Sequence, residues 1–83
     1  MKNRITLESI KDSVKYFDIC WGKEYAQFYP EDYNNVIYCL QKFLIDNNID
    51  KEIVSIHVNY IKFGGSDDLY TLTTKEIYTL FQK

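Results

Sequence analysis

The strongest constraint on the fold of this chain is a change in its hydrophobic period near residue 50. The stretch "PEDYNNVIYCLQKFLIDNN", residues 30–48, has apolar side chains three or four positions apart, as in an amphipathic helix. Over residues 54–60 apolar residues occupy every second position, as in a strand with one buried face. The chain must therefore pack helix against sheet, which predicts an α+β fold.

The helical stretch predicts a helix over about residues 31–46. Pro30 suits the first turn, Glu31 and Asp32 suit the positive end of the helix dipole, and Asn47 or Asn48 suits its end. The expected buried face consists of Tyr33, Val36, Ile37, Leu40, Phe43 and Leu44.

An earlier stripe predicts a second helix, over about residues 7–20. Thr6 suits the capping position, with Ile5 packed onto Ile10, and Gly22 suits the left-handed conformation that closes a helix. The stripe itself is formed by Leu7, Ile10, Val14, Phe17 and Trp21.

The C-terminal third predicts a β-hairpin followed by one more element. Alternation over residues 54–60 indicates a half-buried strand, "GGSDD" at 64–68 a turn, and "LYTLT" at 69–73 the returning strand. Alternation breaks at Ile61 and Phe63, which suggests a bulge or an exposed patch. The predicted element order up to this point is α-α-β-β.

A capping box at Thr73 and Glu76 predicts a closing helix, with Ile77, Leu80 and Phe81 as its apolar residues. A third strand over the same residues, 74–82, is the alternative. The expected fold is thus α-α-β-β-α, a two-stranded antiparallel hairpin packed on helices.

Length and composition predict a single folded domain, residues 1–83. The 83 residues leave room for one core, and a 17% aromatic content lets few side chains fill it. A core of this size contributes little net stability, so we expect a monomer or a homodimer.

Charge argues against direct nucleic-acid binding. Twelve acidic and ten basic residues give a net charge of -2, without the basic run that neutralises phosphates. Two helices and a hairpin also resemble a short winged-helix arrangement, yet the hairpin turn is acidic and the 31–46 helix offers only Lys42. A winged-helix-like nucleic-acid binder remains a minor alternative.

The chain lacks the side-chain sets of common enzymes. His57 is its only histidine, and the sequence contains no zinc-protease, phosphate-loop or serine-nucleophile motif. Cys20, Cys39 and His57 match no usual zinc spacing, so we expect no metal, no cofactor and no catalysis. The two cysteines are expected to be reduced, buried thiols, and a surface role is expected for His57.

The N-terminal residues and the hydropathy predict a cytoplasmic protein. "MKNRITLES" lacks the apolar stretch of a signal peptide, and no run of apolar residues is long enough to span a bilayer. The abundance of Asn, Ile, Lys and Tyr, all read from AT-rich codons, is typical of a low-GC bacterium or its phage. We therefore expect the protein in a bacterial host cell.

The stretch "KEYAQFYPEDYNN", residues 23–35, combines large rings with carboxylates around the only proline. Aromatic loops beside carboxylates are typical of protein recognition surfaces. The alternative is that Tyr25, Phe28 and Tyr29 fold back as a lid on a small core. On the first hypothesis the predicted partner-binding residues, with some from the second helix and the hairpin, are Glu24, Tyr25, Tyr29, Glu31, Asp32, Asn34, Asn35, Tyr38, Asp67, Asp68 and Tyr70.

Part of this stretch resembles a known inhibitor family. "FYPEDYNNVIYCL", residues 28–40, is similar to the binding loop and second helix of the barstar family of intracellular ribonuclease inhibitors. Phe28, Tyr29, Glu31 and the Cys39-Leu40 pair stand in corresponding places, whereas Asn34 and Tyr38 replace that family's inhibitory carboxylates. The resemblance is local and assigns no family.

Together these features predict a small acidic inhibitor that binds another protein. Carboxylates can replace phosphates and rings can replace bases, so its expected partner has a basic, nucleic-acid-handling surface. A phage-encoded anti-defence protein of the anti-CRISPR kind is the first expectation. An immunity protein or antitoxin is the second, and an adaptor subunit without inhibitory activity is the third.

Overall fold

The first element is a short helix that starts at the predicted cap. In this computed structural model, which describes residues 5–82, the Thr6 hydroxyl accepts the Ser9 N–H at 3.1 Å, and Ser9 Oγ accepts the Thr6 N–H at 2.9 Å. Helix α1 (Leu7–Ile10) therefore begins as expected, but it ends after one turn and continues as the 3-10 turn η1 (Lys11–Ser13).

The predicted helix over residues 7–20 is wrong beyond this turn, because Val14–Trp21 forms strand β1. β-branched and aromatic residues favour a strand here. A bulge between Val14 and Tyr16 inserts one extra residue, so Val14 and Phe17 are both buried although they are three positions apart. That spacing imitates a helical stripe.

A tight turn joins β1 to strand β2 (Glu24–Phe28), a strand that was not predicted from the sequence. Gly22 has φ of 59°, the left-handed conformation, but it opens the two-residue hairpin turn instead of closing a helix. Glycine is preferred there because a type II′ turn needs positive φ at its first central residue.

Helix α2 (Val36–Asp46) begins five residues later than predicted. Asp32 holds a turn instead: its carboxylate accepts the Asn34 N–H and the Asn35 Nδ2–H, each at 2.9 Å. Such local bonds compete with helix formation. Tyr33 consequently lies before the helix and is exposed, contrary to its expected place in the core. The predicted end at Asn47 is confirmed.

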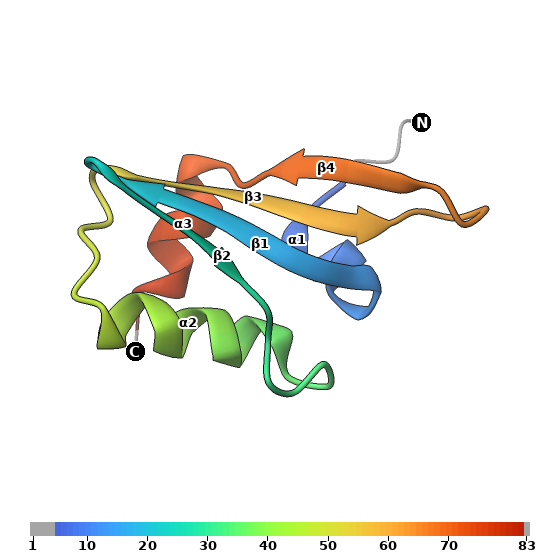
Figure 1. Cartoon of the computed structure of the whole chain (residues 1–83), viewed down its shortest axis with the longest axis horizontal. Helices are drawn as coiled ribbons and strands as arrows, with labels where there is room; N and C mark the ends of the chain where they lie inside the picture. The colour runs from blue at the N-terminus through green and yellow to red at the C-terminus, as the bar shows by residue number, and fades with distance from the viewer. Residues whose placement is uncertain (1–4, 83) are drawn as a thin grey trace.

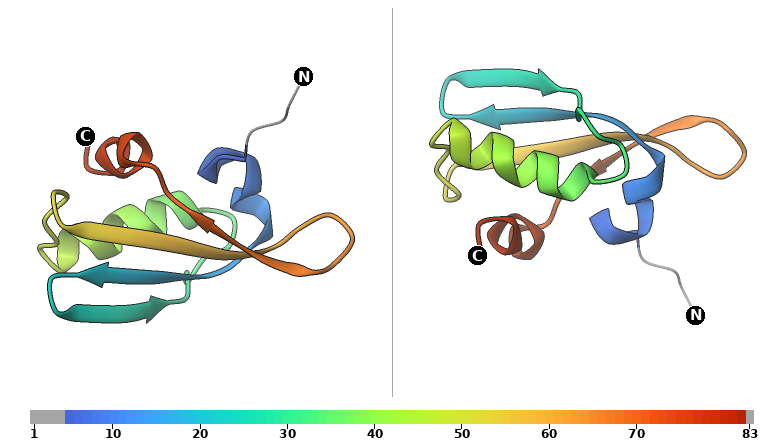
Figure 2. Two further views of the ribbon diagram at one scale, coloured as in Figure 1. Left: turned by 90° about the horizontal axis from the view of Figure 1, so that it is seen from above. Right: turned by 90° about the horizontal axis from the view of Figure 1, so that it is seen from below.

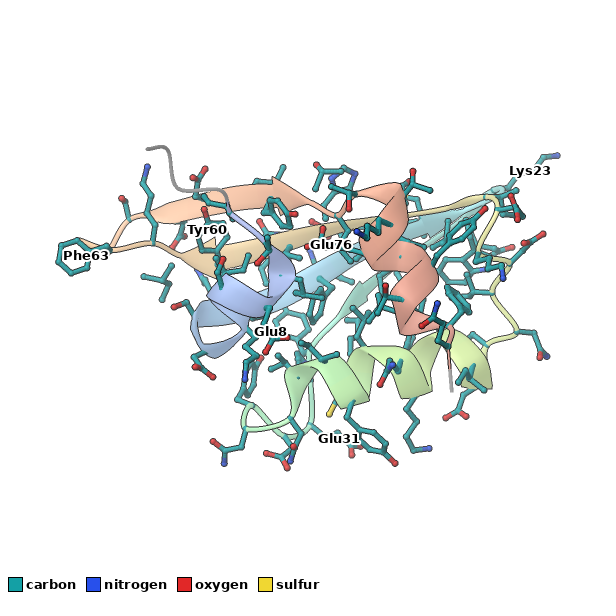
Figure 3. The ribbon with its side chains drawn as sticks, turned by 180° about the vertical axis from the view of Figure 1, so that it is seen from behind. Glu8, Lys23, Glu31, Tyr60, Phe63 and Glu76 are labelled. Atoms are coloured by element: carbon teal, nitrogen blue, oxygen red, sulfur yellow. The ribbon has the colours of Figure 1, made fainter. Side chains whose placement is uncertain are left out.

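The C-terminal elements are confirmed as strand β3 (Val54–Ile61), strand β4 (Asp67–Thr71) and helix α3 (Thr74–Leu80), but β4 begins and ends two residues earlier than predicted. Asp67 and Asp68 therefore belong to the strand and not to the turn. The Thr73–Glu76 capping box forms, which excludes the alternative of a third strand there. The break in alternation after Tyr60 produces an exposed patch, with Phe63 fully exposed at the hairpin tip (Figure 3).

The four strands form one antiparallel sheet in the order β2-β1-β3-β4, so the α+β class is confirmed with two more strands than expected. In the described part of the chain, the helices all lie on one side of this sheet (Figures 1 and 2). The side chains that are completely buried between sheet and helices are Phe17, Ile19, Leu40, Leu44, Ile56 and Val58.

Candidate functional site

The other side of the sheet carries no helix from residues 5–82, and we call it the open face (Figure 2). Because side chains alternate along a strand, each strand that buries apolar residues on one side presents a second set here. The open face consists of Tyr16, Asp18, Cys20, Tyr25, Gln27, Ser55, His57, Asn59, Ile61, Asp67, Leu69 and Thr71, with Tyr29 at its margin.

Asp18 is the centre of a polar network on this face. Its Oδ1 accepts the Tyr25 hydroxyl at 2.6 Å and its Oδ2 accepts Asn59 Nδ2–H at 2.9 Å. The hydrogen bond to Asp18, together with partial burial and the carboxylate's charge, raises the pKa of Tyr25 above its usual value. The phenol therefore stays neutral and remains a donor, while each Asp18 oxygen keeps a further acceptor site.

His57 lies directly opposite Asp18 in the β1–β3 register. Its Nδ1 is 2.9 Å from Thr71 Oγ1 on the neighbouring strand. This position agrees with the surface location expected for the histidine.

Two tyrosines pair at the β2 side of the face. The rings of Tyr16 and Tyr29 are 5.0 Å apart, and Tyr25 and Tyr29 are 59% and 57% exposed. Phe28 instead points into the core, with its ring 4.7 Å from that of Phe43. The core-lid alternative thus holds for Phe28 and fails for the two tyrosines.

The acidic loop, residues 31–35, lies on the α2 side of the molecule (Figure 3). The hydrogen bond from Asn35, with a second from the Asn34 N–H, lowers the pKa of Asp32, so this carboxylate is charged at neutral pH. Beside the loop is a hollow lined by Glu8, Lys11, Asp12, Tyr33, Asn34, Asn35, Val36, Ile37 and Tyr38. The predicted residues Asn34, Asn35 and Tyr38 therefore share one surface with two further carboxylates.

The predicted residues do not form one continuous site. Glu24 is exposed at the edge of β2, opposite Trp21 and away from the acidic loop. Asp67 forms an ion pair with Lys15, with Nζ and Oδ2 2.9 Å apart. Tyr25 and Tyr29 lie at the open face, so the set divides between that face, the acidic loop and the hairpin.

Two residues predicted on the hairpin have structural contacts. Asp68 accepts the Leu69 N–H at 2.9 Å and lies 3.9 Å from Lys62 Nζ. Tyr70 packs against the core, and its hydroxyl donates to Glu76 at 2.6 Å. Tyr70 is therefore unsuited to the partner surface that the sequence predicted for it.

Tyr16, Asp18 and Asn59 were not among the site residues predicted from the sequence. Asn59 alternates with the buried residues of the correctly predicted strand, so its outward position could have been inferred. Tyr16 and Asp18 were assigned to a helix, which concealed their alternation with Phe17 and Ile19.

The remaining chemistry of the described residues is limited. Cys20, on the open face, and Cys39, on α2, are free and half-buried, so the expectation that both would be buried is not met. In residues 5–82 no three His, Cys, Asp or Glu side chains converge as around a metal ion.

None of the described helices is long and apolar enough to cross a bilayer. The winged-helix alternative loses its structural basis, because its first helix is largely strand β1.

No protein-family profile matches this chain, and no curated protein or solved structure is significantly similar to it.

Proposed function

We propose that this chain is a non-enzymatic inhibitor that binds a partner protein and covers a basic, nucleic-acid-handling surface on it. The observation that carries the proposal is that Tyr25 and Tyr29 are exposed, while other side chains form the buried core. Tyrosine supplies a large contact area with few rotatable bonds, which is why it is enriched at protein interfaces. Both residues are more than half exposed and are available to a partner.

The charge distribution supports a basic partner. On the open face, the two groups that donate hydrogen bonds to Asp18, the Tyr25 hydroxyl and the Asn59 amide, are neutral and not cationic. Glu31 and Asp32 lie in the exposed acidic loop. Lys15, at the bulge in β1, is neutralised by Asp67. The partner's arginine and lysine side chains, which bind nucleic-acid phosphates, would bind these carboxylates in place of the phosphates.

An anti-defence role, such as that of an anti-CRISPR protein encoded by a phage or another mobile element, is the first specific candidate. It suits a small acidic domain acting in a bacterial cytoplasm, as a monomer or a homodimer. The second candidate is an immunity protein or antitoxin, which would neutralise a toxin by the same kind of contact. Phage genes beside its own would support the first candidate, and an adjacent toxin gene the second.

Partner capture with charge-reversal variants tests the proposal. Wild type and Glu31→Lys/Asp32→Lys are used to capture partners from a host lysate, and the captured protein is identified by mass spectrometry and purified. We expect the variant to bind it about tenfold more weakly or worse, because like charges across an interface cost several kcal/mol. Adding wild type should also release labelled nucleic acid from the partner.

Asp46→Lys/Glu52→Lys is the matched control. It changes the net charge equally, at the last residue of α2 and in the turn that follows the helix, and should bind as wild type does. Equal affinity of both variants for the partner at low salt would exclude the acidic loop as the partner-binding site. A partner that retains its nucleic acid in the presence of the protein would exclude the inhibitory role.

A further inference from the structure

The two edges of the sheet differ in how they are protected against pairing with another strand. On β4, Asp68 Oδ1 accepts the outward Leu69 N–H at 2.9 Å, and Asp67 is held by Lys15. A carboxylate that occupies an edge N–H prevents a further strand from using it. The β4 edge is therefore blocked at Leu69, the middle one of its outward-facing residues.

The β2 edge has no such protection among the described residues. Trp21 and Glu24 flank the two-residue turn, so alternation of the ladder places the N–H and C=O groups of Tyr25 and Gln27 on the side away from β1. Both side chains are exposed, and both views in Figure 2 show β2 as the outermost strand, with no described element beyond it. This edge offers two donors and two acceptors in strand geometry.

The residues of this edge are complementary to themselves when two copies run antiparallel. With Ala26 opposite Ala26 of a second copy, Tyr25 faces Gln27, Glu24 faces Phe28 and Lys23 faces Tyr29. No like charges meet, and the smallest side chain lies at the centre, where the backbones approach most closely. Lys23 can also lie against the Tyr29 ring of the other copy.

We propose that β2 pairs with β2 of a second copy of this chain, which extends the sheet to eight strands across a twofold axis. An axis perpendicular to the sheet keeps both open faces on one side, so Tyr25 and Tyr29 of both copies form one continuous surface. The role of this combined tyrosine surface in binding rests on the proposed function, whereas the pairing of the two copies requires no other protein. A five-residue strand buries little area, so the association is weak and depends on concentration.

Sedimentation analysis over a wide concentration range tests the pairing. The molar mass of the wild type should rise from 10.0 kDa toward twice that value. Ala26→Lys and Ala26→Glu should each remain at 10.0 kDa, because like charges then meet at the centre, and an equimolar mixture should regain the higher mass. A wild type that stays monomeric up to millimolar concentration would overturn the proposal.

Two backbone variants separate pairing from folding. Gln27→Pro removes an outward N–H that is not used in pairing with β1 and should abolish dimerisation, whereas Leu69→Pro removes an outward N–H on the blocked β4 edge and should leave dimerisation intact. Thermal melts confirm that each variant folds. A Gln27→Pro protein that is folded and still dimeric would overturn the proposal.

Cross-linking provides a readout that does not depend on these variants. In a Cys20→Ser/Cys39→Ser background, Ala26→Cys should form a disulfide-linked dimer on mild oxidation, because residues opposite each other at a non-hydrogen-bonded site have close Cα atoms, about 4.5 Å apart. Leu69→Cys is the control and should remain uncross-linked. Equal cross-linking of both would contradict pairing through β2. Partner binding enters none of these measurements, so failure of the dimer and failure of the proposed inhibition are distinguishable.

Discussion

The two faces of the sheet carry opposite kinds of side chain on the same strands. On β1, Phe17 and Ile19 are completely buried, whereas their neighbour Asp18 hydrogen-bonds with Tyr25 and Asn59 on the open face. On β3, Ile56 and Val58 are completely buried and flank His57. One strand thus contributes to the core and to a surface at the same time, at alternate positions.

This comparison separates stability from recognition. Burying apolar area drives folding, so substitutions on the helix side should lower the free energy of unfolding. Substitutions on the open face leave the core intact and should change binding more than stability. Four predictions test the separation, in order of decreasing effect on stability.

Phe17→Ala should have the largest effect, a loss of about 3–5 kcal/mol in the free energy of unfolding. The ring is completely buried, and its removal leaves a cavity against Phe28. Gln27→Ala, an exposed neighbour on β2, is the matched control and should cost about 0.5 kcal/mol or less. Urea denaturation followed by circular dichroism measures both. Similar losses in the two variants would show that the faces do not differ.

Leu40→Ala should cost about 2–5 kcal/mol, because Leu40 of α2 is completely buried against the sheet. Tyr38→Ala on the exposed side of the same helix should cost far less, since its ring is 63% exposed. Calorimetric thermal midpoints compare the two. An unchanged midpoint for Leu40→Ala would contradict the assignment of this helix face to the core.

Glu76→Gln should cost about 1–3 kcal/mol at neutral pH. The carboxylate accepts the Leu7 N–H and the Thr73 N–H at 2.9 Å and the Tyr70 hydroxyl at 2.6 Å, so it joins α1, α3 and β4. Burial alone would raise the pKa of Glu76, but these hydrogen bonds outweigh it and the pKa lies below its usual value.

The depressed pKa of Glu76 sets the direction of a pH dependence. A carboxyl whose pKa is lower in the folded state stabilises the fold above its unfolded pKa, about 4.3, and this contribution is lost as pH falls through the folded pKa. Wild type and Glu76→Gln should therefore differ most at neutral pH and converge in acid. Denaturation curves at several pH values check this, and a difference that grows toward acid would contradict it.

Tyr25→Phe and Tyr29→Ala should have the smallest effects on the free energy of unfolding, each within the range of ordinary surface substitutions. Tyr25→Phe loses the hydrogen bond to Asp18, and Tyr29→Ala loses the ring contact with Tyr16, both at exposed positions. Thermal melts measure them beside partner-binding assays. Losses of several kcal/mol would restore the core-lid alternative for these rings.

Much of the C-terminal half could be predicted because its signals are local. Alternation from Val54 to Tyr60 and the capping box at Thr73 each depend on residues a few positions apart. The same holds for the cap at Thr6 and the end of α2 at Asn47. In these segments local preference and tertiary packing agree.

Strands β1 and β2 could not be predicted in the same way. The bulge after Val14 gives β1 a spacing of three that also fits a helix, and only pairing with β3 on one side and β2 on the other decides between them. Asp32 likewise moves the start of α2 through bonds to its own loop. The candidate site was consequently predicted in part: its exposed tyrosines and acidic loop were named, but Asp18 and the open face were not.

The sequence alone determined the α+β class, the places where several elements begin and end, and the deficit of positive charge, because composition, caps and periodicity act over a few residues. Tertiary structure alone decided which side of the sheet remains uncovered, which edge is blocked and which tyrosines the core leaves exposed. Those outcomes depend on strand order and register, which join residues as distant as Asp18 and Asn59. No local pattern along the chain specifies such pairings.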